Sequence, residues 1–117
     1  MNRIDGAEEL PLEVSVGEVK ALLEQSDPVF LVDCREPNEH DYCQIEGACL
    51  IPMNETPQRL SELEPYRDKR LVVHCHHGGR SLQVTQWLRA QGFAQVQNMS
   101  GGIDAWSLEV DPEIPRY

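Results

Sequence analysis

Short stretches rich in Val, Leu, Ile and Met recur along this chain of 117 residues, separated by polar, glycine-bearing or proline-bearing segments. The run Val-Phe-Leu-Val at residues 29–32 is apolar throughout and is bounded by Pro28 and Asp33. Continuous apolar runs of this length are typical of parallel strands that are covered on both faces. The pattern predicts five strands, at residues 12–14, 29–32, 48–51, 71–73 and 96–99.

Helical patterns lie between these strands. Ser15, with Glu18 three residues later, has the form of a capping box, which predicts a helix that ends near residue 25. Residues 81–91 carry apolar side chains at i, i+3 and i+4 and end before Gly92, as a second helix would. Further helices are predicted at residues 38–42, at residues 56–63 with Pro57 in the first turn, and through Ala105 and Trp106 after a Gly101-Gly102 turn.

Strands that alternate with helices predict an α/β fold with three layers, α/β/α, around a central, mostly parallel five-stranded sheet. Such sheets bind ligands beyond the carboxyl ends of their strands. Asp33, Cys34 and Arg35 follow one predicted strand, and Cys75 follows another. We therefore expect these four residues to lie at the same edge of the sheet.

Length and charge narrow the function. The chain fits one domain, which we place at residues 12–117 behind a flexible acidic segment at residues 1–11. The net charge of −10 argues against nucleic acid and anionic membranes as partners. Because no apolar run exceeds four residues and the N-terminus is polar, we expect a cytoplasmic protein. Residues 65–95 nevertheless hold five basic side chains against one acidic one, an arrangement that suits either a solvated surface or an anionic ligand.

Four cysteines are present, and none forms a C-x-x-C pair, so the sequence indicates neither a zinc knuckle nor a thioredoxin motif. Without a secretory signal, disulfides are not expected. Cys49 is interpreted as a core residue and Cys43 as a loop residue without a role. Cys34 follows a strand directly, so an approach to the site stays open.

The richest segment is residues 74–81, His-Cys-His-His-Gly-Gly-Arg-Ser, where a strand turns into a helix. No residue of 76–81 is proline, so six backbone N–H groups are available to surround one anion, and two glycines permit the positive φ that such a ring needs. A cysteine beside a helix N-terminus and a cation has its pKa lowered from about 8.5 to roughly 3.5–7.5. The segment predicts a thiolate at Cys75, with the helix dipole and Arg80 acting in the same direction.

A metal site is not expected, because adjacent histidines rarely converge on one ion; a general-base role for His77 stays open.

Four blocks in order make the chain resemble the single-domain rhodanese-like sulfurtransferase family over residues 12–110. They are Leu31-Val32-Asp33-Cys34-Arg35-Glu36-Pro37, Ile45-Glu46-Gly47-Ala48 with Ile51-Pro52, Cys75-His76-His77-Gly78-Gly79-Arg80-Ser81, and Gly101-Gly102 with Ala105-Trp106. Two residues depart from the family pattern: Gln44 stands where histidine is usual, and Glu46 where proline is usual. Both lie in a turn away from the cysteine, so they bear on local geometry and not on the chemistry.

The resemblance implies sulfur transfer through a Cys75 persulfide, without a cofactor or a metal. It implies that the rest of the active loop binds the donor or persulfide; the loop residues are His76, His77, Gly78, Gly79, Arg80 and Ser81. It also implies that Asp33 and Arg35 bridge loop segments near the active edge, and a strand-end ion pair with no catalytic part stays open as the alternative. The implied donor is a small one such as thiosulfate. The ending at residues 110–117 is similar to the tail of rhodanese modules fused to adenylylating enzymes of sulfur-carrier proteins, so a sulfur-carrier or persulfide-relay protein stays open as a partner.

Two other functions compete with this interpretation. Phosphatases and arsenate reductases of related fold use a Cys-x5-Arg loop, one residue longer than the Cys75-to-Arg80 spacing here. A non-catalytic rhodanese-like binding module usually lacks the loop cysteine, which is present in this chain.

Overall fold

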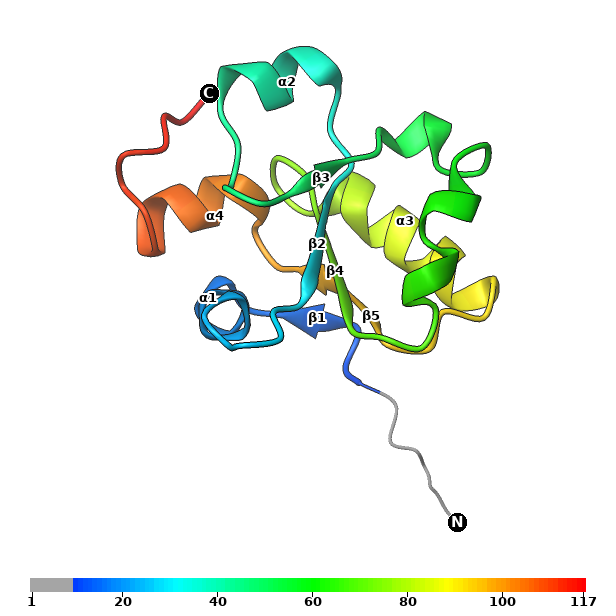
Figure 1. Ribbon diagram of the computed structural model, residues 1–117. Coiled ribbons are helices and arrows are strands. Elements are labelled where there is room, and N and C mark those ends of the chain that lie inside the picture. The colour runs from blue at the N-terminus through cyan, green and yellow to red at the C-terminus, as the bar shows by residue number, and fades with distance from the viewer. Residues whose placement is uncertain (1–9) are drawn as a thin grey trace.

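The computed structural model describes residues 10–117, and its centre is a five-stranded sheet with the strand order β1-β5-β4-β2-β3 (Figure 1). All four strand pairings are parallel. The strands are β1 (Glu13–Val14), β2 (Phe30–Asp33), β3 (Cys49–Leu50), β4 (Leu71–His74) and β5 (Val96–Met99). Each of the five predicted strands is confirmed, and the expected α/β/α class with it.

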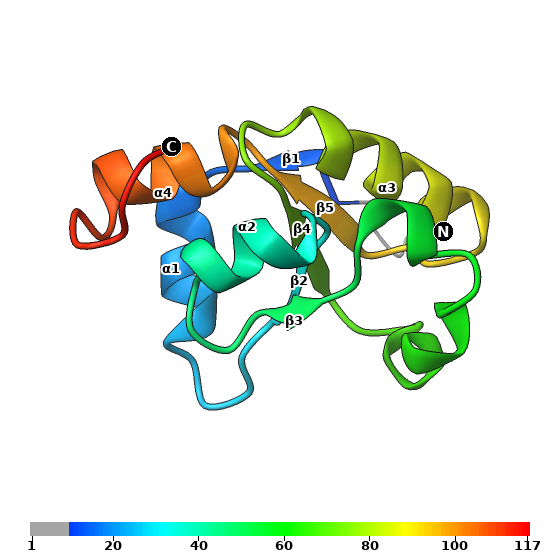
Figure 2. The ribbon, with the colours of Figure 1, turned by 90° about the horizontal axis from the view of Figure 1, so that it is seen from above.

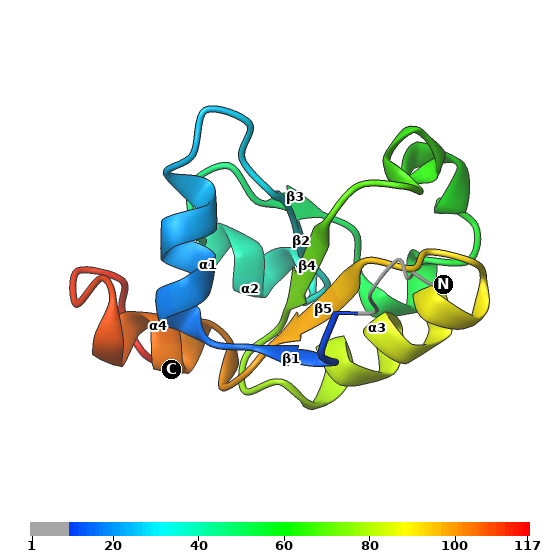
Figure 3. The ribbon, with the colours of Figure 1, turned by 90° about the horizontal axis from the view of Figure 1, so that it is seen from below.

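Helices cover both faces of the sheet. α1 (Val16–Leu23) and α4 (Gly102–Glu109) lie on one face, and α3 (Gly79–Ala90) lies on the other (Figures 2 and 3). α2 (Pro37–Tyr42) follows β2 and lies over the carboxyl edge of the sheet (Figure 1). Among the described residues, no helix combines the length and the apolar character that a membrane crossing requires.

Two cores result from the alternation of side chains along the strands. Leu31 and Val72 pack toward α1 and α4, whereas Val32 and Val73 pack toward α3. All four side chains are at most 2% exposed. The continuous apolar runs of the sequence therefore reflect strands that are buried on both faces.

The helix starts follow local chemistry. Ser15 caps α1, and the reciprocal hydrogen bonds with Glu18 form the capping box that the sequence predicts. α3 begins at Gly79, two residues before the predicted start, because Gly78 takes a left-handed conformation (φ 112°) that turns the chain directly into the helix.

The helix expected at residues 56–63 does not form. The chain makes three short 3₁₀ turns there, Met53–Glu55, Leu60–Glu62 and Glu64–Tyr66. Pro57 and Pro65 have no N–H to donate to the carbonyls of Met53 and Ser61, so neither the turn at Met53–Glu55 nor the turn at Leu60–Glu62 continues as an α-helix. The hydroxyl of Thr56 also donates to the carbonyl of Pro52 at 3.3 Å. With these donors missing, i→i−3 hydrogen bonds replace the α-helical ladder.

The expected flexible segment at residues 1–11 falls almost wholly outside the described residues. Its last two residues, Leu10 and Pro11, are described, and their carbonyls accept hydrogen bonds from Arg89 at 2.8 and 3.1 Å.

Candidate active site

The candidate site is built on the carboxyl ends of β2 and β4. The register of these strands pairs Asp33 with His74, so Cys34 and Cys75 occupy the next position on neighbouring strands. The backbone N–H of Cys34 donates to the carbonyl of His74 at 3.0 Å, which extends the pairing to the edge. Both cysteine side chains point into the core under α3 and are at most 1% exposed. The sequence had left the approach of Cys34 open, and the structure places it beside Cys75.

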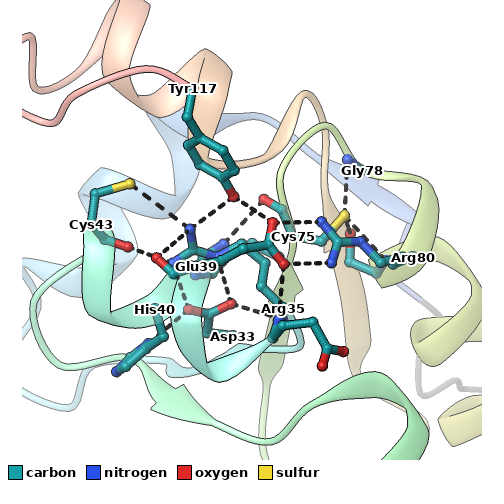
Figure 4. A network of polar contacts seen from close by, with 12 residues as sticks. Asp33, Arg35, Glu39, His40, Cys43, Cys75, Gly78, Arg80 and Tyr117 are labelled. Atoms are coloured by element: carbon teal, nitrogen blue, oxygen red, sulfur yellow. Dashed lines mark hydrogen bonds and ion pairs between the residues drawn. The ribbon is translucent and has the colours of Figure 1, made fainter.

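The sulfur of Cys75 is an acceptor for several donors (Figure 4). The N–H of Gly78 lies 3.1 Å from Sγ, and Ser81 adds its N–H at 3.4 Å and its hydroxyl at 3.3 Å. Of the six loop amides expected to surround an anion, these are the two that hydrogen-bond to Sγ. Because α3 begins inside this loop, the dipole of the helix also points its positive end at the sulfur.

These contacts control the charge of the two thiols. The hydrogen bond from Cys34 is the largest influence on Cys75; burial opposes it, and the donors of Ser81 and Gly78 add to it, so that the pKa of Cys75 falls to about 4. The same hydrogen bond and burial raise the pKa of Cys34 far above its ordinary value. Cys34 is therefore a neutral S–H donor beside a thiolate.

The N-terminus of α4 supports the loop from below. The N–H groups of Ile103 and Asp104 donate to the carbonyls of Cys75 and His76 at 2.9 and 3.1 Å. Gly102 makes this approach possible: a Cβ there would overlap both carbonyl oxygens, and its φ of +62° is one that side chains rarely adopt. The carbonyls of Cys75 and His76 thus face α4, while the amides of Gly78 and Ser81 face the sulfur.

Arg80 does not point freely into the site. Its guanidinium makes two parallel hydrogen bonds to the carboxylate of Glu39 in α2, at 2.8 and 3.0 Å. These bonds are the main reason that the pKa of Glu39 falls from 4.5 to about 2. The pair connects the first turn of α3 to α2 across the loop. Glu39 was missed at the sequence level, because its partner lies 41 positions away.

Asp33 and Arg35 form a fully buried ion pair below α2. Two hydrogen bonds join the guanidinium to the carboxylate, at 2.9 and 2.7 Å, and His40 lies 2.8 Å from the same carboxylate. Burial alone would raise the pKa of Asp33, but the hydrogen bonds from Arg35 and His40 outweigh it and the pKa is lowered. Removing one partner would leave a buried charge unpaired, at a cost of about 3–5 kcal/mol.

Cys43 helps to hold the Asp33–Arg35 ion pair in place, contrary to the expectation that it has no role. Its carbonyl accepts a 2.7 Å hydrogen bond from Arg35, and its side chain is buried. Arg35 thereby ties the end of β2 to the end of α2. The sequence carries no local signal for a backbone carbonyl that serves as an acceptor.

The last residue of β4, His74, and the two loop histidines, His76 and His77, differ in environment. His74 is fully buried, which lowers its pKa. The ring of His76 packs on that of His77, whose side chain is 66% exposed and 3.9 Å from Asp104. Within residues 10–117 no three His, Cys, Asp or Glu side chains gather in a way that could hold a metal ion.

Comparison with known proteins decides the family. The sequence profile of the rhodanese-like domain matches residues 15–109. The chain belongs to the rhodanese-like domain family. The matched residues include both sheet-edge cysteines, the loop at residues 75–81 and the glycines that open α4.

Individual relatives agree with this membership. The rhodanese-like/PpiC domain-containing protein 12 of Arabidopsis thaliana is 45% identical over 100 residues, which are 78% of this rhodanese-like chain and 33% of that protein. This chain thus spans about a third of the length of that relative. A protein of Allochromatium vinosum named sulfurtransferase is 36% identical over 95 residues, 81% of this chain and 87% of its own. The crystal structure of a rhodanese-like domain protein from Staphylococcus aureus superposes with a TM-score of 0.76 at 30% identity, covering 90% of this chain and 97% of that one.

Proposed function

We propose that this rhodanese-like chain is a sulfurtransferase that carries sulfane sulfur from thiosulfate or a persulfide donor to a nucleophilic acceptor as a persulfide on Cys75. One observation carries the proposal: the sulfur of Cys75 receives hydrogen bonds from Gly78 and Ser81 at the positive end of α3. A thiolate held in this way is both a nucleophile and a good leaving group.

In the first half-reaction the Cys75 thiolate attacks the outer sulfur of thiosulfate. The bond between Sγ and that sulfur forms, the S–S bond of the donor breaks, and the electron pair leaves with sulfite. The negative charge moves from Sγ to the terminal sulfur of the new persulfide. The amides of Gly78 and Ser81 already point at Sγ, beside which that charge forms, so little reorganisation is needed.

In the second half-reaction an acceptor such as cyanide, a thiol or a protein persulfide acceptor attacks the terminal sulfur. The bond between Sγ and that sulfur breaks, and its electron pair returns to Sγ as thiolate. Neither oxidant nor metal enters the balance. A covalent intermediate between two substrates predicts ping-pong kinetics.

The other loop residues take supporting parts in this proposal. Gly78 and Ser81 donate to the sulfur, Gly79 opens the helix, and the backbone carbonyl of His76 anchors the loop on α4. His77 lies at the exposed rim, where it can meet the donor or the acceptor. Arg80 supplies the positive charge near the anionic donor, and the Asp33–Arg35 pair holds the edge on which Cys75 sits.

The size of the site favours a small donor or a thin protein segment as the acceptor. Cys75 is 1% exposed, so only a narrow group reaches its sulfur. A sulfur-carrier or persulfide-relay protein would present such a group on an extended end. The net charge of −10 disfavours nucleic acid and anionic membranes as partners.

The proposal is tested by treating the protein with thiosulfate, measuring its mass, and assaying thiocyanate formation from thiosulfate and cyanide. We expect a gain of one sulfur atom on Cys75 and turnover that is abolished by Cys75→Ser. Cys49→Ser is the matched control, because Cys49 is a free, half-buried cysteine of β3 outside the loop.

Three results would contradict the proposal. Full activity in Cys75→Ser would show that Cys75 is not the nucleophile. Faster hydrolysis of p-nitrophenyl phosphate than sulfur transfer would show that the protein is a phosphatase. An adduct on Cys34 in place of Cys75 would reassign the site.

A further inference from the structure

Residues 110–117, which we call the tail, fold back along α4 to the active loop. The N–H groups of Val110 and Asp111 donate to the carbonyl of Trp106 at 2.8 and 2.9 Å, and the hydroxyl of Ser107 donates to the carbonyl of Ile114 at 2.6 Å. Arg116 then pairs with Asp104 at 2.8 Å, in the first turn of α4. The tail is thereby held at several points and carries Tyr117 to the carboxyl edge of the sheet (Figures 1 and 2).

The ring of Tyr117 covers the second residue of the loop. It stacks on the ring of His76, with centroids 3.8 Å apart and an interplanar angle of 5°. The ring of Tyr42 in α2 packs against the ring of Tyr117 in an edge-to-face arrangement, with centroids 5.9 Å apart. Tyr117 therefore lies between α2 and the loop and contacts both.

The hydroxyl of Tyr117 joins the two charged groups behind the loop (Figure 4). It accepts a hydrogen bond from Nη1 of Arg35 at 3.0 Å and donates one to Oε2 of Glu39 at 2.7 Å. Burial and the hydrogen bond to Glu39 raise the pKa of Tyr117 to about 12, against the influence of Arg35, so the hydroxyl keeps its proton and remains a donor.

Glu39 is the group through which this contact reaches the site. Its carboxylate accepts four hydrogen bonds: two from Arg80, one from the hydroxyl of Tyr117 and one from the backbone N–H of Glu36 at 2.9 Å. A carboxylate held from three directions keeps one orientation, and a bidentate guanidinium follows the orientation of its carboxylate. The charge of Arg80 acts on the sulfurs of both Cys75 and Cys34.

We propose that Tyr117 is a positioning residue: by bridging Arg35 and Glu39 and stacking on His76, it holds Arg80 where its charge favours an anionic donor at Cys75. The inference rests on the proposed sulfur transfer. It adds the tail, which lies beyond the residues matched by the family profile, to the site.

Tyr117→Phe tests the hydroxyl alone, because the ring and its stacking on His76 remain. Tyr117 acts on the donor only through Glu39 and Arg80, so the loss is smaller than that of a direct hydrogen bond to a charged group. We expect kcat/KM for thiosulfate to fall roughly three- to tenfold. Because cyanide is small and carries at most one charge, its kcat/KM changes by less than about twofold. Tyr117→Ala removes the stacking as well and lowers kcat/KM for thiosulfate further.

Tyr42→Phe is the matched control. It removes a hydroxyl from the neighbouring tyrosine, for which the structure shows no hydrogen bond within residues 10–117, and it keeps the ring that contacts Tyr117. The kcat/KM values for thiosulfate and for cyanide should both stay unchanged in this variant.

A second measurement reports the charge at Cys75 without turnover. The rate of alkylation of Cys75 by anionic iodoacetate is divided by the rate with neutral iodoacetamide. A positive charge at the site raises this ratio, so Tyr117→Phe should lower it, in the same direction as Arg80→Gln, and Tyr42→Phe should leave it unchanged.

The outcomes separate the two proposals. If the wild-type protein transfers no sulfur but the ratio falls in Tyr117→Phe, the proposed function is wrong and the positioning role stands. If the wild-type protein is active and Tyr117→Phe keeps both the thiosulfate parameter and the ratio, the positioning role is wrong. A loss of melting temperature with equal losses for both substrates shows a structural role alone and also overturns it.

Discussion

The two cysteines at the ends of β2 and β4 differ in protonation state. Cys75 is the thiolate, and Cys34 is a neutral S–H donor to it. Parallel strands lie about 4.8 Å apart, so residues in register bring their side chains into contact when both point to the same face. The register of Asp33 with His74 produces this contact one position later. A buried sulfur that is almost out of reach of water thereby gains a partner that carries no competing charge.

For this pair of cysteines we predict that Cys34→Ala raises the pKa of Cys75, because the largest stabilising hydrogen bond is lost and burial still opposes the thiolate. The pH dependence of Cys75 alkylation by iodoacetamide measures the change. The midpoint should shift upward by about one to two pH units, the range expected for one charge-assisted hydrogen bond.

Cys34→Ser is the matched variant, since it keeps a donor at the same position and should restore most of the low pKa. An unchanged midpoint in Cys34→Ala would show that the loop amides alone stabilise the thiolate.

Among the elements, the junctions on either side of the loop decide the geometry of the site. α3 begins inside the loop and turns two amides toward the sulfur, while α4 begins beneath it and receives two carbonyls. Both helices start after a left-handed glycine, Gly78 and Gly101. Because the amides and carbonyls of the loop have opposite partners, the backbone can face the thiolate without leaving its carbonyls unsatisfied.

For these elements we predict that Gly102→Ala destabilises the fold and the loop together. The new Cβ would overlap the carbonyls of Cys75 and His76 at a φ of +62°, so α4 has to move away from the loop. We expect a loss of about 2–4 kcal/mol in the free energy of unfolding, measured by urea denaturation, and slower alkylation of Cys75.

The matched control for this substitution is Gly17→Ala in α1, where an added Cβ meets no atom within 4 Å. It should be neutral or stabilise by up to about 1 kcal/mol, because alanine favours helices over glycine. Equal stability of the two variants would mean that the contact of α4 with the loop leaves room for a Cβ at residue 102.

Across the whole molecule, one network of charged groups and the neutral hydroxyl of Tyr117 connects β2, α2, α3 and the tail. Arg35 joins Asp33 to Tyr117, and Glu39 joins Tyr117 to Arg80 (Figure 4). Asp33 and Arg80 are separated by 47 positions in the sequence, and Tyr117 lies 78 positions after Glu39. The network therefore closes the carboxyl edge of a sheet whose strands alone would leave it open.

This network predicts a loss of stability in acid. The pKa of Glu39 is lowered from 4.5 to about 2 on folding, so its contribution is complete above 4.5 and is lost as the pH falls through 2. Asp33, whose pKa is also lowered, acts in the same direction. For Glu39 the loss amounts to about 1–3 kcal/mol, since the pair lies near solvent.

Urea denaturation of Glu39→Gln and of the wild-type protein, at neutral pH and near pH 2, measures this contribution. The variant should be less stable at neutral pH, and the difference should shrink in acid. Glu46→Gln, which changes an exposed carboxylate of a turn, should follow the wild-type protein at both values. A constant difference across the pH range would contradict the assignment to Glu39.

Much of the fold was open to prediction from local pattern. The strand at residues 29–32 was marked by its continuous apolar run, and the start of α1 by the Ser15–Glu18 capping box, because both signals depend on neighbours in the chain. The 3₁₀ turns after Pro52 were not predicted. Their apolar spacing is compatible with an α-helix, but the backbone closes i→i−3 hydrogen bonds, and Pro57 and Pro65 stop the preceding turns from continuing as an α-helix.

The sequence by itself determined the family, the sheet and the loop in which Cys75 lies, since these depend on short-range spacing and on the alternation of strands and helices. Only the tertiary structure decided which groups surround that loop. Cys34 becomes a donor through strand register, Glu39 takes hold of Arg80 across 41 positions, and Tyr117 reaches His76 from the tail. Contacts of this kind are made between surfaces that folding brings together, and no spacing along the chain records them.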